Sequence, residues 1–526
     1  MLRFVGTAML GLLLACPRLL AQNVVPPSPA PPSNLEALRG WFVQHLGQDR
    51  FRHARWGVRV VSLDTGREVF AHAGDQLFVP ASNTKLFTGA LALDRLGPEF
   101  RMRTSLLAEG PVDDHGVLPG DLVVYGRGDP TFAARHHHGS LMEALDPLVT
   151  AVRQAGVRRI RGGLVMDATF FDGPTLGSGW EWDDLQFDYG AEVSSLTLND
   201  NTVDLVVRPG AVPGQPARVS IDPAGGFVVV SNLCVTAPAG VARDVRFERA
   251  LDRNMIHVTG QIPAGGGAWV ETVAIHDPAA WCGEILRECL AQRGVVVDGP
   301  IRTRLPSPGQ AGGVPAARWR ELGAVESPPL RRLLGLMLKP SQNLYAQLLL
   351  LQVGAAEQAR IRTNGGASAL PATTEAAGIE ALNRFLAGAG IGRDEAIFEE
   401  GSGLTRRNLV TPAAIVRLLQ FMDRHPQAAV FREALPVAGI DGTLRNRMKG
   451  TAAAGNARAK TGGLSMVATL SGYVTSRAGE RFAFALMLNN YRSADANRPM
   501  RVELDDIVVT LAGLDWKTAA AAQAAP

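Results

Sequence analysis

Apolar positions near the two ends of the chain recur with the periods of helices and strands. Leu35, Leu38, Phe42 and Leu46 repeat at helical spacing, and Ser33 before them is a candidate N-cap. Further along, the pattern predicts a hairpin of strands 56–64 and 67–71, a helix over 82–96, a hairpin of strands 465–475 and 481–489, and a helix over 495–514. Both ends of the chain therefore combine helices with antiparallel strands.

The middle of the chain has a different pattern. From about residue 101 to residue 300, short β-like runs are separated by Gly, Pro and Asp. These runs cover residues 122–125, 163–167, 202–208, 226–231, 254–260 and 268–276, and helices are expected only at 141–155 and 279–294. We infer that a β-rich insertion divides one α+β domain into an N-terminal piece and a C-terminal piece.

A chain of 526 residues is expected to hold two or three domains. The patterns place the N-terminal piece at 35–100, the insertion at 101–300 and the C-terminal piece at 301–515, with a tail at 516–526. A Gly-, Ala- and Thr-rich segment at 363–374 is predicted to be a surface loop.

The N-terminus has the features of an export signal. A basic residue and an apolar stretch over 3–15, too short for a permanent membrane span, predict a signal at 1–21, followed by a Pro-rich linker at 22–34. Cleavage near Ala21 competes with a lipoprotein signal in which Cys16 carries a lipid, and ordinary secretion is slightly favoured. We expect the protein in the periplasm or cell envelope, with membrane contact only through the signal peptide or that lipid.

Composition narrows the class of protein. With 46% hydrophobic and 20% charged residues the chain is expected to be a globular protein with a large core. A net charge of +3, without basic runs interleaved with aromatic residues, gives no support for nucleic-acid binding. Cys234, Cys282 and Cys289 are predicted to be buried apolar residues, because no cysteine spacing indicates zinc and the last two are badly placed to bond each other.

Lysine is scarce, and its positions carry the strongest signal. Five of the 53 basic residues are lysine: Lys85, Lys339, Lys449, Lys460 and Lys517. A lysine can lose its proton in a suitable environment, whereas a guanidinium stays charged. The chain reads Ser-Asn-Thr-Lys at 82–85, Ser-Gln-Asn at 341–343 and Lys-Thr-Gly at 460–462, which is the active-site order of penicillin-recognising serine acyl transferases.

Each of these residues has a chemical role to fill. Ser82 would be the nucleophile and Lys85, one helical turn later, the base that takes its proton. The helix N-terminus, burial and the nearby cation Lys460 would all lower the pKa of Lys85. Ser341 would pass the proton from Lys85 towards the leaving amine, and Asn343 would hold the lysine and the substrate backbone.

The last motif would bind the substrate. Lys460 and Thr461 would hold its terminal carboxylate, and Gly462 and Gly463 would let the backbone pass close to it. The N–H groups of Ser82 and Gly463 are candidates for an oxyanion hole. Three such motifs in this order arise by chance in roughly one per cent of chains or fewer. Nothing in this chemistry requires a metal or an organic cofactor.

The sequence resembles the penicillin-binding protein 4-like D-alanyl-D-alanine carboxypeptidases/endopeptidases, peptidase family S13. Beyond the three motifs, the resemblance rests on segments at 126–131, 180–184, 189–191, 198–201, 277–279, 401–406 and 435–444, and it spans roughly residues 35 to 515. It has two departures from the family pattern. Glu400 stands where aspartate is common, and Gly463 stands where serine or threonine is common.

The resemblance implies a fold and an activity. The fold would be a serine β-lactamase/DD-peptidase-like transpeptidase domain, an antiparallel sheet flanked by helices, with a large β-rich insertion of two nested domains. The activity would be that of an exported serine-type DD-peptidase, a D-Ala-D-Ala carboxypeptidase and/or DD-endopeptidase. It would cleave peptidoglycan stem peptides through an acyl-enzyme on Ser82, and β-lactams would be covalent inhibitors.

Other functions stay open at this point. A β-lactamase-like enzyme or a D-amino esterase could use the same scaffold, and a catalytically silent peptidoglycan-binding protein is a further alternative. Intact motifs argue against a silent site. The sequence leaves open the preference between terminal D-Ala and cross-links, the diamino acid of the stem peptide and the oligomeric state.

Three other local patterns have simpler interpretations. The histidines at 136–138 tempt a metal assignment, but adjacent histidines in a polar segment are more often a loop. Asp183 and Asp184 beside two tryptophans are expected to be structural. Ser402 lacks the flanking pattern of a nucleophile elbow and is expected to shape a loop near the site.

Overall fold

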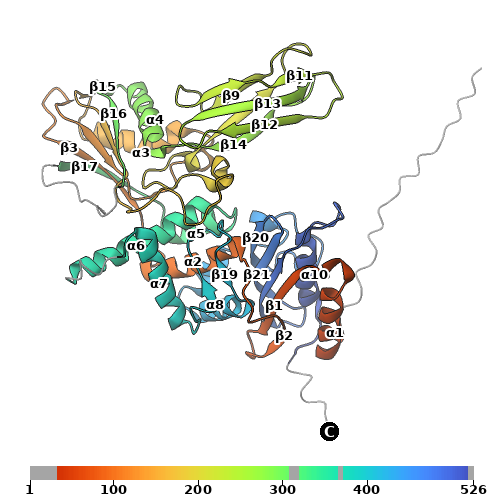
Figure 1. The fold of residues 1–526 in the computed structure, drawn as a ribbon. Coiled ribbons are helices and arrows are strands. Elements are labelled where there is room, and N and C mark those ends of the chain that lie inside the picture. The colour runs from red at the N-terminus through yellow and green to blue at the C-terminus, as the bar shows by residue number, and fades with distance from the viewer. Residues whose placement is uncertain (1–31, 307–318, 365–370, 519–526) are drawn as a thin grey trace, which may run out of the picture.

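The structure is a computed structural model that describes residues 32–306, 319–364 and 371–518 (Figure 1). The predicted export signal with Cys16, most of the linker, part of the predicted loop at 363–374 and most of the tail lie outside these residues. Within the described ranges, no helix has both the length and the apolar character needed to cross a membrane.

One five-stranded antiparallel sheet is built from both ends of the chain. Its strand order is β2-β1-β22-β21-β20. The strands are β1 (Arg55–Ser62), β2 (Glu68–His72), β20 (Arg458–Leu464), β21 (Val467–Thr475) and β22 (Arg481–Asn489). Both predicted hairpins are confirmed, and β1 joins them by pairing with β22, so that Val58 lies opposite Leu486.

Helices cover both faces of this sheet (Figure 1). On one face lie α1 (Leu35–Leu46) and α10 (Met500–Gly513); on the other lie α2 (Thr84–Leu96), α5 (Leu330–Leu338), α6 (Asn343–Thr363), α7 (Thr374–Gly388), α8 (Pro412–Arg424) and α9 (Ala428–Glu433). Successive side chains of β22 point to opposite faces of the sheet and pack into the two cores that lie on those faces. Phe484 and Leu486 join the cluster of α1 and α10, while Ala485 and Met487 join the cluster of α2 and its neighbours. A short pair, β18 (Ala396–Ile397) and β19 (Leu409–Val410), lies beside the second group.

The predicted N-cap of the first helix and the predicted start of the last helix were both wrong. The N-cap of α1 is Asn34, not Ser33, because Asn34 Oδ1 accepts a hydrogen bond of 2.9 Å from the Ala37 N–H. The last helix begins at Met500 rather than Asp495, because Pro499 has an extended backbone and the residue before a proline avoids helical geometry.

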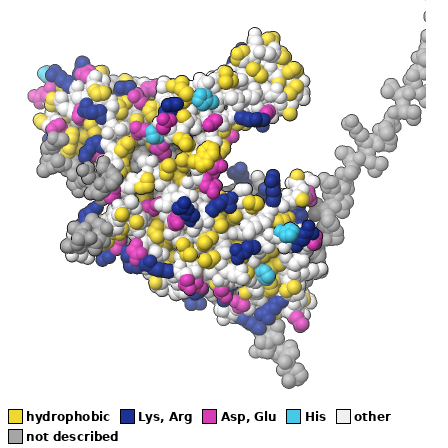
Figure 2. Space-filling view, viewed as in Figure 1, with side chains coloured by type: hydrophobic (Ala, Val, Ile, Leu, Met, Phe, Trp, Pro, Cys, Tyr) yellow, Lys and Arg dark blue, Asp and Glu magenta, His cyan; other side chains and the backbone are white. Residues whose placement is uncertain are grey.

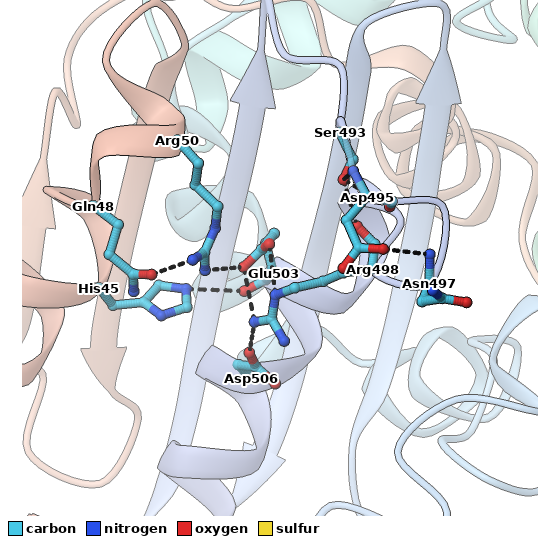
Figure 3. A network of polar contacts seen from close by, with 9 residues as sticks. All are labelled: His45, Gln48, Arg50, Ser493, Asp495, Asn497, Arg498, Glu503 and Asp506. Carbon is cyan, nitrogen blue, oxygen red and sulfur yellow. Dashed lines mark hydrogen bonds and ion pairs between the residues drawn. The ribbon is translucent and has the colours of Figure 1, made fainter.

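A polar network ties α1 and the turn after it to the start of α10 (Figure 3). The fully buried carboxylate of Glu503 accepts hydrogen bonds from Arg50 at 2.8 Å and from Arg498 at 2.8 and 3.0 Å. His45 Nε2 lies 3.3 Å from the carbonyl oxygen of Glu503. Arg498 also pairs with Asp506. The network therefore fastens the two chain ends to each other on the outer face of the sheet.

The described part of the inserted region contains two large hydrophobic cores and a smaller cluster on β3, β5 and β7. The first surrounds α3 (Leu141–Gln154), α4 (Pro278–Gln292), the sheet β16-β7-β5-β3-β17 and the sheet β15-β6-β4. Its strands are β3 (Arg103–Glu109), β4 (Val117–Leu118), β5 (Leu122–Tyr125), β6 (Arg159–Ile160), β7 (Leu164–Asp167), β15 (Val296–Val297), β16 (Ile301–Arg304) and β17 (Trp319–Glu326). The second core lies between the sheet β14-β8-β9 and a sheet centred on β13. Its strands are β8 (Thr202–Arg208), β9 (Arg218–Asp222), β10 (Val229–Asn232), β11 (Val235–Ala237), β12 (Asp244–Arg249), β13 (Met255–Pro263) and β14 (Trp269–Ala274).

Two strands beyond the expected boundary at residue 300 pair with strands of the inserted region. β16 pairs with β7, and β17 pairs with β3 over Arg103–Glu109. Because these strands complete a sheet of the insertion, we propose that the insertion ends after Glu326 and that the C-terminal piece begins with α5. The space-filling view shows a recess between the inserted sheets above and the body below, on the side where β20 lies (Figure 2).

Candidate active site

The nucleophile candidate lies in a tight turn that leads into α2. Ser82 belongs to a 3₁₀ turn over Ala81–Asn83, and α2 begins at Thr84 rather than at Ser82. Two hydrogen bonds fasten this turn to β21. Thr469 Oγ1 donates to Pro80 O at 2.9 Å, and Asn83 Nδ2 donates to Ser471 Oγ at 2.8 Å. The sheet therefore fixes the position of the serine.

Lys85 connects the first two motifs. Its Nζ lies 2.9 Å from Ser82 Oγ, 2.6 Å from Asn343 Oδ1 and 2.6 Å from the carbonyl oxygen of Ser402. Asn343 Nδ2 donates a hydrogen bond of 2.8 Å to the carbonyl oxygen of Tyr189, so its Oδ1 faces the lysine. Tyr189 belongs to the inserted region, which thus takes part in positioning the lysine.

The environment of Lys85 disfavours a charged amine. The side chain is fully buried. Burial lowers its pKa to about 7, and the nearby carboxylate of Glu400 acts in the opposite direction. A lysine with this pKa is about half neutral at pH 7.

Ser341 and Lys460 form a second pair. Ser341 has a left-handed backbone, with φ of 71°, in the turn between α5 and α6. Its Oγ lies 2.7 Å from Lys460 Nζ, which also donates to Thr461 O at 2.7 Å. Lys460 is fully buried, and burial together with Lys85 lowers its pKa well below the ordinary value. The structure thus places the hydroxyl of Ser341 beside Lys460, whereas the sequence predicts that it relays a proton from Lys85.

The remaining residues of the third motif lie along β20, the outer strand of the sheet. Thr461 Oγ1 donates to Thr443 Oγ1 at 2.9 Å. At Gly462 a side chain is impossible without movement, because a Cβ there would lie 2.2 Å from Thr469 Oγ1 and 2.7 Å from Pro80 O. Gly463 is exposed, with nothing within 4 Å of a Cβ. Only the first glycine is therefore required by packing.

Sequence reasoning missed how the loop after β18 supports Lys85. Ser402 was expected only to shape a loop near the site, and its carbonyl oxygen contacts the lysine directly. Glu400 Oε2 accepts from the Ser402 N–H at 2.7 Å, and Oε1 accepts from Gly403 N–H at 2.5 Å and Asn408 Nδ2 at 2.9 Å. Glu400 is fully buried. The segment 401–406 had been noted only as part of a family pattern, and a backbone carbonyl has no sequence signature.

The other patterns singled out in the sequence lie elsewhere. His136 Nε2 lies 2.8 Å from Tyr345 Oη at the start of α6. Among the described residues, no group of three or more His, Cys, Asp or Glu is arranged to hold a metal ion. Cys234, Cys282 and Cys289 are free and buried, as predicted.

Comparison with known proteins gives the same family that the three motifs indicate. The D-Ala-D-Ala carboxypeptidase 3 (S13) family matches residues 40–511. The chain is 36% identical over 470 residues to a D-alanyl-D-alanine carboxypeptidase of Actinomadura sp. (strain R39), which covers 87% of this chain and 81% of that protein. It is 28% identical over 442 residues to D-alanyl-D-alanine carboxypeptidase DacB of Haemophilus influenzae, and this match covers 84% of this chain and 86% of that protein.

The fold is shared with a solved structure. The crystal structure of penicillin binding protein 4 from Haemophilus influenzae matches with a TM-score of 0.74 at 24% identity, covering 91% of this chain and 98% of that one. This likeness confirms the expected α+β fold class, a sheet flanked by helices and interrupted by a β-rich insertion. The chain belongs to the D-Ala-D-Ala carboxypeptidase 3 (S13) family.

Proposed function

We propose that this protein is an exported serine-type DD-peptidase that cleaves peptidoglycan stem peptides through an acyl-enzyme on Ser82. The observation that carries the proposal is the buried amine of Lys85, 2.9 Å from Ser82 Oγ. Family membership supplies the reaction class, that of D-alanyl-D-alanine carboxypeptidases. The same serine would be acylated by β-lactams.

The hydrogen bonds around Lys85 support its role as the base. A neutral amine has two N–H donors and one lone pair. The carbonyl oxygen of Ser402 and Oδ1 of Asn343 are both acceptors, and each lies 2.6 Å away. They occupy the two N–H groups, which leaves the lone pair for the hydroxyl hydrogen of Ser82.

In the proposed reaction, Ser82 Oγ attacks the carbonyl carbon of the penultimate D-Ala while Lys85 takes the hydroxyl proton. The C–N bond then breaks, and the leaving D-Ala nitrogen takes a proton from Ser341. Lys460, at 2.7 Å, returns a proton to Ser341, and the proton that Lys85 took from Ser82 replaces it on Lys460, so that Lys85 is neutral again. Water then attacks the ester, with Lys85 again as the base, and regenerates Ser82.

The third motif would orient the substrate. We assign its terminal carboxylate to the paired hydroxyls of Thr461 and Thr443, with Lys460 behind them. The N–H groups of Ser82 and Gly463 are the candidate oxyanion hole. Because β20 is the outer strand and the recess in Figure 2 lies on its side, an extended peptide has a route to this edge.

The test is the mass of the intact protein after incubation with benzylpenicillin, together with release of D-Ala from a stem peptide ending in D-Ala-D-Ala. Wild type is expected to gain one long-lived penicilloyl group and to release D-Ala. Ser82→Ala is expected to do neither. Ser220→Ala, an exposed serine on β9, is the matched control and is expected to behave as wild type.

Two outcomes would overturn the proposal. Rapid destruction of penicillin without an adduct would favour a β-lactamase-like enzyme. Neither adduct nor D-Ala release would favour a silent peptidoglycan-binding protein. A cross-linked peptide dimer offered as a second substrate measures whether the enzyme also acts as an endopeptidase.

A further inference from the structure

A cavity lies where the inserted region meets α6 and α7, and it shares no residue with the three motifs. Its volume is about 130 Å³. The inserted region contributes Asp172 and Ser195, and the helices contribute Leu351 and Glu375. Reciprocal hydrogen bonds of 2.8 Å between Asp172 and Thr374 fasten this wall to the start of α7.

Two residues that line this cavity each have a buried polar atom without a partner among the described residues. Asp172 is 6% exposed and Ser195 is 2% exposed, and both line the cavity. Asp172 Oδ1 and Ser195 Oγ are buried and make no hydrogen bond with any residue that the structure describes. An unpaired buried polar atom costs on the order of 1–3 kcal/mol, so such atoms are seldom left without a purpose.

The charge of the cavity wall and its apolar surface determine which kind of ligand would pair with Asp172 Oδ1 and Ser195 Oγ. The acidic residues of its wall are Asp172, Glu192, Asp277 and Glu375, and no lysine or arginine of the described residues lines it. Glu192 is already paired with His276 at 2.6 Å, and Glu375 with Ser178 at 2.5 Å. Most of the remaining wall is apolar, with Phe171 and Leu351 among its residues. A cavity of roughly 150 Å³ accommodates a molecule the size of benzene, so a ligand here is small.

We propose that this cavity binds a small aliphatic ammonium group. The N–H donors of the ligand would bond the free oxygens of Asp172 and Ser195, and its carbon atoms would lie against Phe171 and Leu351. An ammonium group has three donors and no acceptor, which suits a wall whose unpartnered atoms are a carboxylate oxygen and a hydroxyl. This function is additional to the acylation of Ser82.

One residue of the cavity wall, Gln347, also contacts the loop that supports Lys85, the proposed base. Gln347 lines the cavity, and its Nε2 donates to Glu375. Its Oε1 accepts a hydrogen bond of 2.8 Å from the Gly401 N–H, next to Ser402, whose carbonyl oxygen contacts Lys85. Occupancy of the cavity is therefore expected to alter the rate at which Ser82 is acylated.

The test compares isobutylamine with isobutanol, which has nearly the same shape and no charge, by calorimetric titration of the full chain at pH 8. We expect isobutylammonium to bind with a millimolar Kd and isobutanol to bind about tenfold more weakly or not at all. Asp172→Asn is expected to weaken amine binding about tenfold or more, and Ser195→Ala to a smaller extent. Asp114→Asn, at an exposed aspartate far along the chain, is the matched control and is expected to change nothing.

Three results would overturn the site: no binding of the amine up to about 50 mM, equal binding of the alcohol, or full affinity in both Asp172→Asn and Ser195→Ala. If a thermal melt shows that Asp172→Asn is not folded, the amine affinity of Ser195→Ala alone decides whether the site is correct. With the amine saturating, the rate of acylation by penicillin is expected to change about twofold or more in wild type and not in Asp172→Asn. Amine binding without a change in the acylation rate would refute the link between the cavity and Lys85, but the binding site itself would still stand.

Discussion

The clearest test of the proposed base is to place a negative charge beside it. Asn343→Asp would put a carboxylate at the position of Oδ1, 2.6 Å from Lys85 Nζ. Two unit charges at about 4 Å interact by about 4 kcal/mol at an effective dielectric constant of 20. Since 1.36 kcal/mol corresponds to one pKa unit, the pKa of Lys85 would rise by about 3 units.

This shift has a large effect on the rate. In wild type, the pKa of Lys85 is about 7, so the neutral fraction is about one half at pH 7 and about nine tenths at pH 8. Acylation of Ser82 needs the neutral amine and should therefore rise with pH through about 7. In Asn343→Asp the rise should move to about pH 10, and the neutral fraction at pH 7 should fall to about 1 in 1,000, a loss of about 500-fold.

The assay is the second-order rate constant of acylation by a chromogenic β-lactam between pH 5.5 and 10.5, with a thermal melt at each pH. Asn446→Asp is the matched control, because exposed Asn446 accepts a hydrogen bond of 3.0 Å from exposed Lys449 and the same change there should leave the profile unaltered. A profile for Asn343→Asp that still rises near pH 7, in a folded protein, would refute the assignment of Lys85 as the base.

Two further predictions concern other parts of the fold. Gly462→Ala should lower Tm and abolish acylation because its Cβ would lie 2.2 Å from Thr469 Oγ1. Gly463→Ser has open space, so it should keep the free energy of unfolding within about 0.5 kcal/mol of wild type and change only the β-lactam acylation rate. Equal effects of both changes would contradict the packing argument. Burial raises the pKa of Glu503, but hydrogen bonds from Arg498 and Arg50 outweigh this effect, so the pKa is lowered overall. The ion pair of Glu503 with Arg498 therefore stabilises the fold above about pH 4.3. This contribution is lost as the pH falls through the lowered pKa. Arg498→Ala should therefore reduce the free energy of unfolding by about 1 kcal/mol at pH 7, because its side chain is partly exposed, and by less near pH 3; urea melts at both values measure this, and an equal loss at both would refute it.

Local patterns were enough for the elements that carry the three motifs. The apolar runs at 465–475 and 481–489 predicted the second hairpin, and the short motifs built around scarce lysines predicted the residues 82–85 and 460–462. The contacts that complete the site are of another kind. Asn343 Nδ2 donates to a backbone carbonyl of Tyr189, and Lys85 contacts the backbone carbonyl of Ser402. Any residue type has such a carbonyl, so these partners follow only from the fold.

The errors have the same origin. β17 was missed because it pairs with β3 across a separation of more than 200 residues, and its own sequence, Trp319–Glu326, lacks a clear alternation. The choice between Ser33 and Asn34 as N-cap depends on one backbone turn, since both residue types cap helices equally well. The contact of Ser341 with Lys460 was not predicted, because the order of the motifs says nothing about which of the two lysines its hydroxyl faces.

The order of the strands also sets a condition on how the protein matures. β1 hydrogen-bonds to β22, and Ser82 is fastened to β21, so the N-terminal piece cannot fold fully until residues near 489 have been synthesised. Pairing between such distant segments is slow, and loop closure over hundreds of residues precedes any stabilising contact. A chain that stops short, or one cut before β20, holds Ser82 and Lys85 without the strands that position them. Reactivity with a β-lactam is therefore a measure of complete synthesis and folding, and a labelled β-lactam could count finished molecules among fragments.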